Sequence, residues 1–285
     1  MDSDPILAPE QLAAHPDALL FDVRTGEQAA SAYAGDHLPG AVFVDLDRDL
    51  SGPQGQPAGG GRHPLPSPAT FAERLCAWGV TPDAHVVIYD EQGGANAAAR
   101  MWWMLRALGH QRVQVLDGGL QAARAAGLAT TGAASSRTPA PPYPAQQWLW
   151  PVADIEQVDE ARQDEKRLLL DVRSAVRYRG EQEAIDPVAG HIPGAVNLPL
   201  TENLTTDGRF KSGLALRAQY QRLLRGRPVE ALVVHCGSGV TACHSLLALE
   251  RAGLGGASLY VGSWSEWCRN PERPRAPSVS AVRAL

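Results

Sequence analysis

The sequence predicts an α/β protein of two tandem domains, each a mainly parallel β-sheet flanked by helices on both faces. Three observations predict this fold class. The chain has 285 residues, more than one domain usually holds. Four segments of its first half recur in its second half. Within each half, short β-branched runs alternate with longer amphipathic ones, which is typical of a parallel sheet covered by helices.

The two halves repeat each other at offsets of 149 (Asp22 and Asp171), 154 (His37 and His191) and 146 (Asp90 and Cys236). The recurring pairs are LLFDVRTGEQ and LLLDVRSAVR, DHLPGAVFVDL and GHIPGAVNLPL, HVVIYDEQGG and ALVVHCGSGV, and VLDGGLQAA and LYVGSWSEW. A period this long indicates duplicated domains rather than a solenoid. We expect domains at 1–130 and 151–285, joined by a Pro/Ala-rich linker at 131–150, where prolines exclude helix interiors. A second Gly/Pro-rich stretch, 51–68, is a long loop of the functional or mobile kind.

Short apolar runs predict four strands in each half. They are Leu19–Val23, Ala41–Val44, Val86–Tyr89 and Val113–Leu116, then Leu168–Val172, Ala195–Leu198, Leu232–His235 and Ser258–Val261. Apolar residues at helical spacing predict helices at Ala95–Leu108 and Val240–Ala252, the latter stopped by Gly253. Such folds bind ligands at the C-terminal ends of their strands.

Composition excludes several classes of function. The net charge is −5, from 26 basic and 31 acidic residues spread along the chain, so we expect no nucleic-acid partner. No apolar run is long enough to span a bilayer, and the N-terminus lacks the pattern of a secretory signal. Four cysteines are too few for a disulfide scaffold. A cytoplasmic protein with reduced thiols is expected.

The segment LVVHC-GSGVT-ACHSLLALERAG reads as strand, tight loop and helix, with Cys236 where the strand ends. Gly237 and Gly239 let the backbone curl around the sulfur, and successive N–H groups from Gly237 to Ala242, Val240 included, form an anion-binding nest. The start of the helix adds its positive end. Sites of this kind lower the pKa of a cysteine from about 8.5 to roughly 3.5–7.5. Cys236 is therefore predicted to be an activated nucleophile.

Other interpretations of this loop are weaker. G-S-G-V-T-A matches a dinucleotide fingerprint, but no carboxylate ends the following strand. A cysteine phosphatase needs an arginine where Ala242 stands. Zinc ligation by the two His-Cys pairs lacks a C-x-x-C spacing, so no metal is expected. A buried structural cysteine is the remaining alternative.

The duplicated D-V-R and H-[LI]-P-G-A-V elements, ARMWWMLRALGH, CGSGVTACH and GSWSEW resemble the two-domain rhodanese family of sulfurtransferases over essentially the whole chain. The loop is similar to that of 3-mercaptopyruvate sulfurtransferases. The resemblance implies a nucleophile only in the second domain, Asp90 taking its place in the first. It also implies ping-pong transfer of sulfane sulfur from 3-mercaptopyruvate or thiosulfate through a Cys236 persulfide to a thiol, such as that of thioredoxin, or to cyanide. No cofactor is required. A thiosulfate-specific enzyme, a sulfur-binding module without catalysis and a cysteine phosphatase are the alternatives.

The resemblance also implies roles for individual residues. Arg177 matches the arginine that binds the carboxylate or sulfonate of the donor. The mercaptopyruvate-type enzymes carry a second arginine nine residues later, where this chain has Asp186, which favours the thiosulfate class. Arg179 is the substitute we expect.

The remaining candidates lie on the loop and in the first half. Ser238 is expected to donate a hydrogen bond to the reacting sulfur or to move a proton. Thr241 is expected to cap the helix and close the nest. His37 matches a histidine implied to relay protons to Ser238, although His191 holds the same place in the second repeat, which favours a structural turn.

Overall fold

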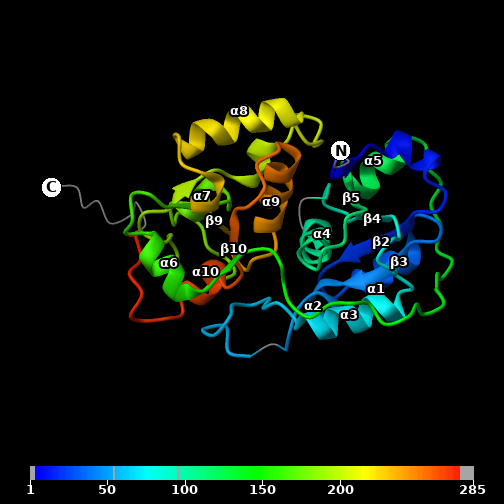
Figure 1. The fold of residues 1–285 in the computed structure, drawn as a ribbon, viewed down its shortest axis with the longest axis horizontal. Helices are drawn as coiled ribbons and strands as arrows, with labels where there is room; N and C mark the ends of the chain where they lie inside the picture. Colours follow the sequence, from blue (N-terminus) through cyan, green and yellow to red (C-terminus); the bar gives the residue numbers. More distant parts are fainter. Residues whose placement is uncertain (1–3, 54, 95–96, 277–285) are drawn as a thin grey trace. The chain divides into compact units, whose positions relative to one another are not determined.

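The computed structural model describes residues 4–53, 55–94 and 97–276, and it divides into two compact units (Figure 1). The first unit holds the chain up to Gly52, Leu65–Trp150 and Thr205–Phe210. The second holds Pro53–Pro64, Pro151–Leu204 and the chain from Lys211 onward. The segment 53–64 thus packs in the second unit, although it lies within the first sequence repeat.

Each unit contains a five-stranded sheet with parallel strand pairings. In the first unit the order is β1 (Ile6–Leu7), β5 (Val113–Leu116), β4 (Val86–Tyr89), β2 (Leu19–Arg24) and β3 (Val42–Asp45). In the second it is β6 (Val152–Ala153), β10 (Ser258–Tyr260), β9 (Leu232–His235), β7 (Leu168–Asp171) and β8 (Val196–Asn197). The same strand order in both units is what a duplicated domain requires.

Helices flank both sheets. Those of the first unit are α1 (Ala29–Gly35), α2 (Leu46–Asp49), α3 (Pro68–Ala77), α4 (Ala97–Ala107) and α5 (Gly119–Ala125), with a 3₁₀ turn η1 (Pro9–Ala14). Those of the second are α6 (Ile155–Ala161), α7 (Ala175–Tyr178), α8 (Gly213–Leu224), α9 (Ala242–Arg251) and α10 (Ser263–Trp267), with η2 (Leu200–Asn203) and η3 (Val229–Ala231). Within the second unit, α8 contacts α9 and runs in a different direction (Figure 1). The predicted α/β fold class is confirmed.

The predicted strands form with their bounds shifted by at most two residues, and β4, β5 and β9 match the prediction. All four residues of β9 are buried, as expected of a central strand covered on both faces. Of the predicted helix Ala95–Leu108, the first two residues lie outside the described residues, and α4 ends at Ala107, one residue before the predicted end. The predicted helix Val240–Ala252 is shorter, because α9 begins at Ala242.

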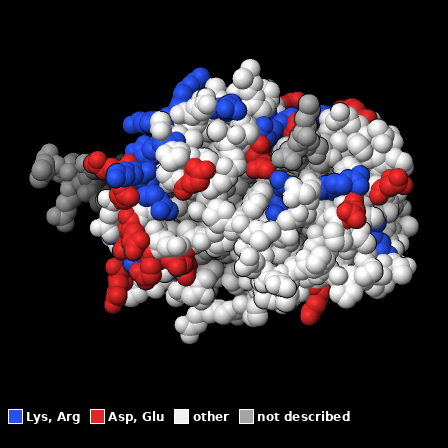
Figure 2. Space-filling model, viewed as in Figure 1, with Lys and Arg blue, Asp and Glu red and all other residues white. Residues whose placement is uncertain are grey.

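Tryptophans of α4 pack against the last residues of the first unit. Trp102 and Trp103, buried in α4, lie edge to face with Trp150, and Trp103 also contacts Trp148. The chain just before the second sequence repeat therefore packs onto the first unit. In the view of Figure 2, neither acidic nor basic side chains dominate the visible face. No helix in the described ranges is both long and apolar enough to cross a membrane.

Candidate active site

Cys236 follows β9, the central strand of the second sheet, and the residue is 1% exposed. Its backbone is fixed by the start of α10. The N–H of Trp264 donates to the carbonyl of Cys236 at 3.0 Å, and the N–H of Ser265 donates to that of Gly237 at 2.8 Å. Because neighbouring parallel strands end at the same edge of a sheet, the chain after β10 meets the loop after β9 here.

Ser263 joins these two strand ends and was not predicted from the sequence. The Cys236 N–H donates to Ser263 Oγ at 3.1 Å, and the Ser263 hydroxyl donates to the carbonyl of Tyr260 at 2.9 Å. Ser263 Oγ lies 4.0 Å from Cys236 Sγ. The φ of Ser263 is +53°, in the left-handed region that is costly for a residue with a side chain. The hydrogen bonds on both sides of the hydroxyl hold Ser263 in this conformation.

The loop after Cys236 is buried and leaves backbone donors unused. Gly239 has a φ of +75°, and a Cβ built on it would lie 2.4 Å from the carbonyl oxygen of Val261, so the position requires glycine. Residues 237–240 are buried. Within the described part of the chain, the N–H groups of Gly237, Ser238, Val240 and Thr241 donate to no protein acceptor. Buried N–H groups without acceptors are rare in proteins, and they indicate a place for an anion.

In the first unit, the amides of the equivalent loop donate to a side chain of the same loop, that of Asp90. Asp90, which holds the place of Cys236, accepts hydrogen bonds from the N–H groups of Gln92 (2.8 Å) and Gly94 (2.7 Å) through Oδ1, and from that of Ala98 (3.1 Å) through Oδ2. In this copy, the loop amides bind a negative charge. In the second unit, Cys236 stands at the strand end in place of this carboxylate.

A histidine from segment 53–64 completes the loop. His63 Nδ1 lies 2.8 Å from Ser238 Oγ, which is a hydrogen-bond distance. The segment is bound to α10 and the turn after it: Gly60 N–H donates to Glu266 Oε1 at 2.8 Å, and Asn270 Nδ2 donates to the carbonyl of Ala58 at 3.0 Å. Burial raises the pKa of Glu266. The sequence marked this stretch only as a long Gly/Pro-rich loop, which was the available signal for His63.

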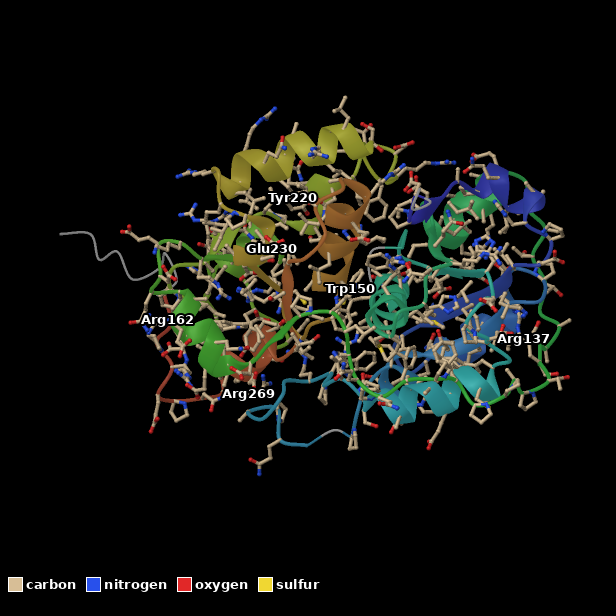
Figure 3. All side chains as sticks on the ribbon, viewed as in Figure 1. Arg137, Trp150, Arg162, Tyr220, Glu230 and Arg269 are labelled. Carbon is tan, nitrogen blue, oxygen red and sulfur yellow. The ribbon has the colours of Figure 1, made fainter. Side chains whose placement is uncertain are left out.

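Arg177 lies beside the loop that follows Cys236. A Cβ built on Gly237 would lie 3.6 Å from Arg177 Nη1, while Arg177 Nη2 donates to Glu183 Oε1 at 2.7 Å. Asp186 is a buried carboxylate that accepts a hydrogen bond from Arg269 Nη1 at 2.8 Å and pairs with Arg62 (Figure 3 labels Arg269). Position 186 is therefore part of the same cluster, but as an anion.

A second buried ion pair lies at the end of β7. Arg173 Nη2 donates to Asp171 Oδ2 at 2.6 Å, and both side chains are almost fully buried. Burial alone would raise the pKa of Asp171, but the Arg173 guanidinium beside it holds that pKa below its ordinary value. Burial lowers the pKa of His235, which keeps the imidazole next to Cys236 neutral.

Three sequence candidates differ from expectation. Thr241 stands at the N-cap of α9, but its backbone is already helical and its side chain makes no capping hydrogen bond, so the predicted cap is wrong. The half-exposed side chain of Arg179 pairs with Glu181 at 2.7 Å. Its guanidinium is therefore bound to a carboxylate of the protein, whereas the sequence suggested that it binds the sulfur donor. His37 is fully buried in the first unit, where its ring nitrogens lie 2.7 and 3.0 Å from the carbonyl oxygens of Tyr33 and Ala133. These hydrogen bonds fit the structural turn, and the histidine described beside Ser238 is His63.

Two further cysteines of the second unit have no such surroundings. Cys243 is fully buried on α9, with its sulfur 3.4 Å from the carbonyl oxygen of Gly239. Burial raises the pKa of Cys268. All four cysteines are free thiols. Cys236 combines a strand-end position with unused loop donors, and it remains the candidate nucleophile.

Comparison with known proteins agrees with this geometry. The Rhodanese-like domain model matches twice, over residues 8–126 and 154–270. A Pseudomonas aeruginosa protein named "Probable 3-mercaptopyruvate sulfurtransferase" is 48% identical, over 97% of this chain and 99% of that protein. Thiosulfate sulfurtransferase of Mus musculus is 38% identical, over 90% of this chain and 83% of that protein. The structure of 3-mercaptopyruvate sulfurtransferase from Leishmania major matches with a TM-score of 0.75 at 34% identity, over 92% of this chain and 73% of that chain. The chain therefore belongs to the rhodanese-like family, with one rhodanese-like domain in each half.

Proposed function

We propose that the protein is a sulfurtransferase in which Cys236 carries a sulfane sulfur as a persulfide. The observation that supports this most directly is the loop beside Cys236, where the N–H groups of Gly237, Ser238, Val240 and Thr241 have no acceptor in the described chain. A persulfide places its negative charge on the outer sulfur, which lies farther into such a loop than a thiolate sulfur does. The names of the relatives point to the same chemistry.

The preferred donor in this proposal is 3-mercaptopyruvate. The Cys236 thiolate attacks the donor sulfur, the carbon–sulfur bond breaks, and its electron pair remains on the carbon that becomes the methyl group of pyruvate. The proton of the donor thiol must move to that carbon. The Ser238 hydroxyl and His63 imidazole, 2.8 Å apart, form a path for this proton. The acceptor, a thiolate such as that of thioredoxin, or cyanide, then attacks the outer sulfur and releases the Cys236 thiolate.

Thiosulfate is the second candidate donor. Its transfer breaks a sulfur–sulfur bond, releases sulfite and needs no proton. The observation in its favour is positive charge: guanidinium groups of Arg62 and Arg177 both lie beside Gly237, which suits a dianion. A donor that carries no thiol proton makes Ser238 and His63 dispensable, and this difference separates the two candidates.

Two measurements test the function. After incubation with either donor, the intact mass of the protein should rise by one sulfur atom and return to its original value on addition of a thiol. The Cys236→Ser variant should show neither the mass change nor turnover, whereas Cys243→Ala should keep both. Full turnover in Cys236→Ser would refute the proposal. The ratio of kcat/KM for 3-mercaptopyruvate and thiosulfate then identifies the donor, and His63→Gln should reduce only the former.

A further inference from the structure

The position of Arg62 is fixed by its own backbone and not only by its side chain. Its N–H donates to Ser265 Oγ at 3.1 Å, on α10. The preceding Gly61 has a φ of +79°, and a Cβ built on it would lie 2.5 Å from the carbonyl oxygen of Gly262. Main chain therefore lies against main chain at this point. Arg62 thus projects from a docked segment rather than from a free loop.

Asp186 holds the side chain of Arg62. The carboxylate of Asp186 is fully buried, and it pairs with Arg62 Nη1, accepts from Arg269 Nη1 at 2.8 Å and lies 3.6 Å from Arg177 Nη2. Glu183, also nearly buried, pairs with Arg177. Arg173 also lies 3.6 Å from Glu183 and pairs with Asp171. Four guanidinium groups thus face three carboxylates, which leaves one positive charge unbalanced in the cluster.

The nitrogens that these acids leave unused point to one place. Arg62 binds Asp186 through Nη1, while its Nη2 lies 3.3 Å from a Cβ built on Gly237. Arg177 binds Glu183 through Nε and Nη2, while its Nη1 lies 3.6 Å from the same point. Each guanidinium group thus presents, toward the residue that follows Cys236, a nitrogen that neither Asp186 nor Glu183 binds.

We propose that Arg62 and Arg177 together bind the anionic group of the sulfur donor, and that Asp186 is a positioning residue for Arg62. This inference rests on the proposed function and adds a residue to it. The two guanidinium groups each offer an N–H group to the same place. This arrangement fits a carboxylate or a sulfonate, whose oxygens are spaced to accept two hydrogen bonds. Arg62, from segment 53–64, is thus the second positive charge that binds the donor. The Asp186 carboxylate holds the Arg62 side chain so that it points toward Gly237, next to Cys236.

The test combines kinetics with a ligand that carries no sulfur. Arg62→Ala should raise KM for the donor by about 10- to 100-fold at nearly unchanged kcat, the effect of losing a charged hydrogen bond that is equal in ground and transition states. The inhibition constant of pyruvate should rise by a similar factor. Arg62→Lys should recover part of the loss. Arg222→Ala, an exposed arginine of α8, is the matched control.

The charge-swapped pair tests the role of Asp186. Asp186→Asn should raise KM, and Arg62→Asp alone should abolish donor saturation. The double variant Arg62→Asp with Asp186→Arg should regain binding, because the cation then stands on the other side of the same pair. If wild type gains sulfur on Cys236 but Arg62→Ala leaves KM and the pyruvate inhibition constant unchanged, this inference is refuted and the proposed function stands. If wild type gains no sulfur from either donor, the proposed function itself fails.

Discussion

Replacing Gly61 with alanine separates the docking of segment 53–64 from the stability of the fold. The added Cβ would lie 2.5 Å from the carbonyl oxygen of Gly262 and 2.8 Å from Ser265 Oγ, distances that a Cβ does not tolerate. Gly40 is a matched control, because its φ of +77° is close to the +79° of Gly61 while nothing lies within 4 Å of its added Cβ. Both alanines are strained, but only one collides with its neighbours.

The strain common to both variants is about 1–2 kcal/mol of unfolding free energy, the cost of the left-handed region for a residue with a Cβ. The collision at Gly61 is relieved by lifting the segment, which gives up its hydrogen bonds to Ser265, Glu266 and Asn270. Arg62 and His63 then move away from Gly237 and Ser238. A misplacement of about 1 Å at a reacting centre costs on the order of 100-fold in rate.

We therefore expect Gly61→Ala to lose about 10- to 100-fold in kcat/KM for 3-mercaptopyruvate, and Gly40→Ala to lose little. Urea denaturation should give similar losses of stability for the two variants. Steady-state sulfur transfer to cyanide measures the first quantity. If kcat/KM of Gly61→Ala equals that of Gly40→Ala, the docked segment does not position Arg62 and His63, and this reasoning is refuted.

Two further predictions concern α9. Thr241→Ala should change the unfolding free energy by less than about 0.5 kcal/mol, because the Thr241 side chain makes no capping hydrogen bond. Ser67→Ala removes the hydrogen bond that caps α3 at the Thr70 N–H, and it should cost about 1 kcal/mol in urea denaturation. Equal losses in the two variants would contradict the geometry of Thr241. Burial lowers the pKa of His244 to about 3, so this neutral histidine stabilises the fold fully above its unfolded pKa of 6.5 and loses that contribution as the pH falls. Between pH 7 and pH 5, wild type should lose about 2 kcal/mol more than His244→Gln, and parallel pH profiles of the two proteins would contradict the shift.

The fold was predictable because its signals are local. β4, β5 and β9 are short β-branched runs that are buried along their whole length, so hydrophobicity alone marked their bounds. β1 and β6 escaped prediction because two residues carry no periodicity. The sequence also predicted Cys236 and Ser238 from a strand end followed by glycines, and Arg177 from the family resemblance.

The rest of the site depends on contacts between distant segments. Arg62 and His63 lie more than a hundred residues before Asp186 and Ser238, and no local pattern assigns segment 53–64 to the second unit. The repeat did provide one clue. His37 and His191 occupy the same place, and each stacks on a tyrosine and faces its helix carbonyls, which is a structural arrangement. A histidine present in both repeats was therefore a poor candidate for proton relay, because only the second repeat carries the candidate nucleophile.

The carboxylate of Asp90 acts as a tethered ligand for the first loop. Because it is attached to the backbone by a single methylene, its effective concentration at the Gln92 and Gly94 amides exceeds that of any dissolved anion. Raising the amount of donor cannot displace it. If Cys236 carries sulfur as proposed, loading should therefore stop at one sulfur atom per polypeptide.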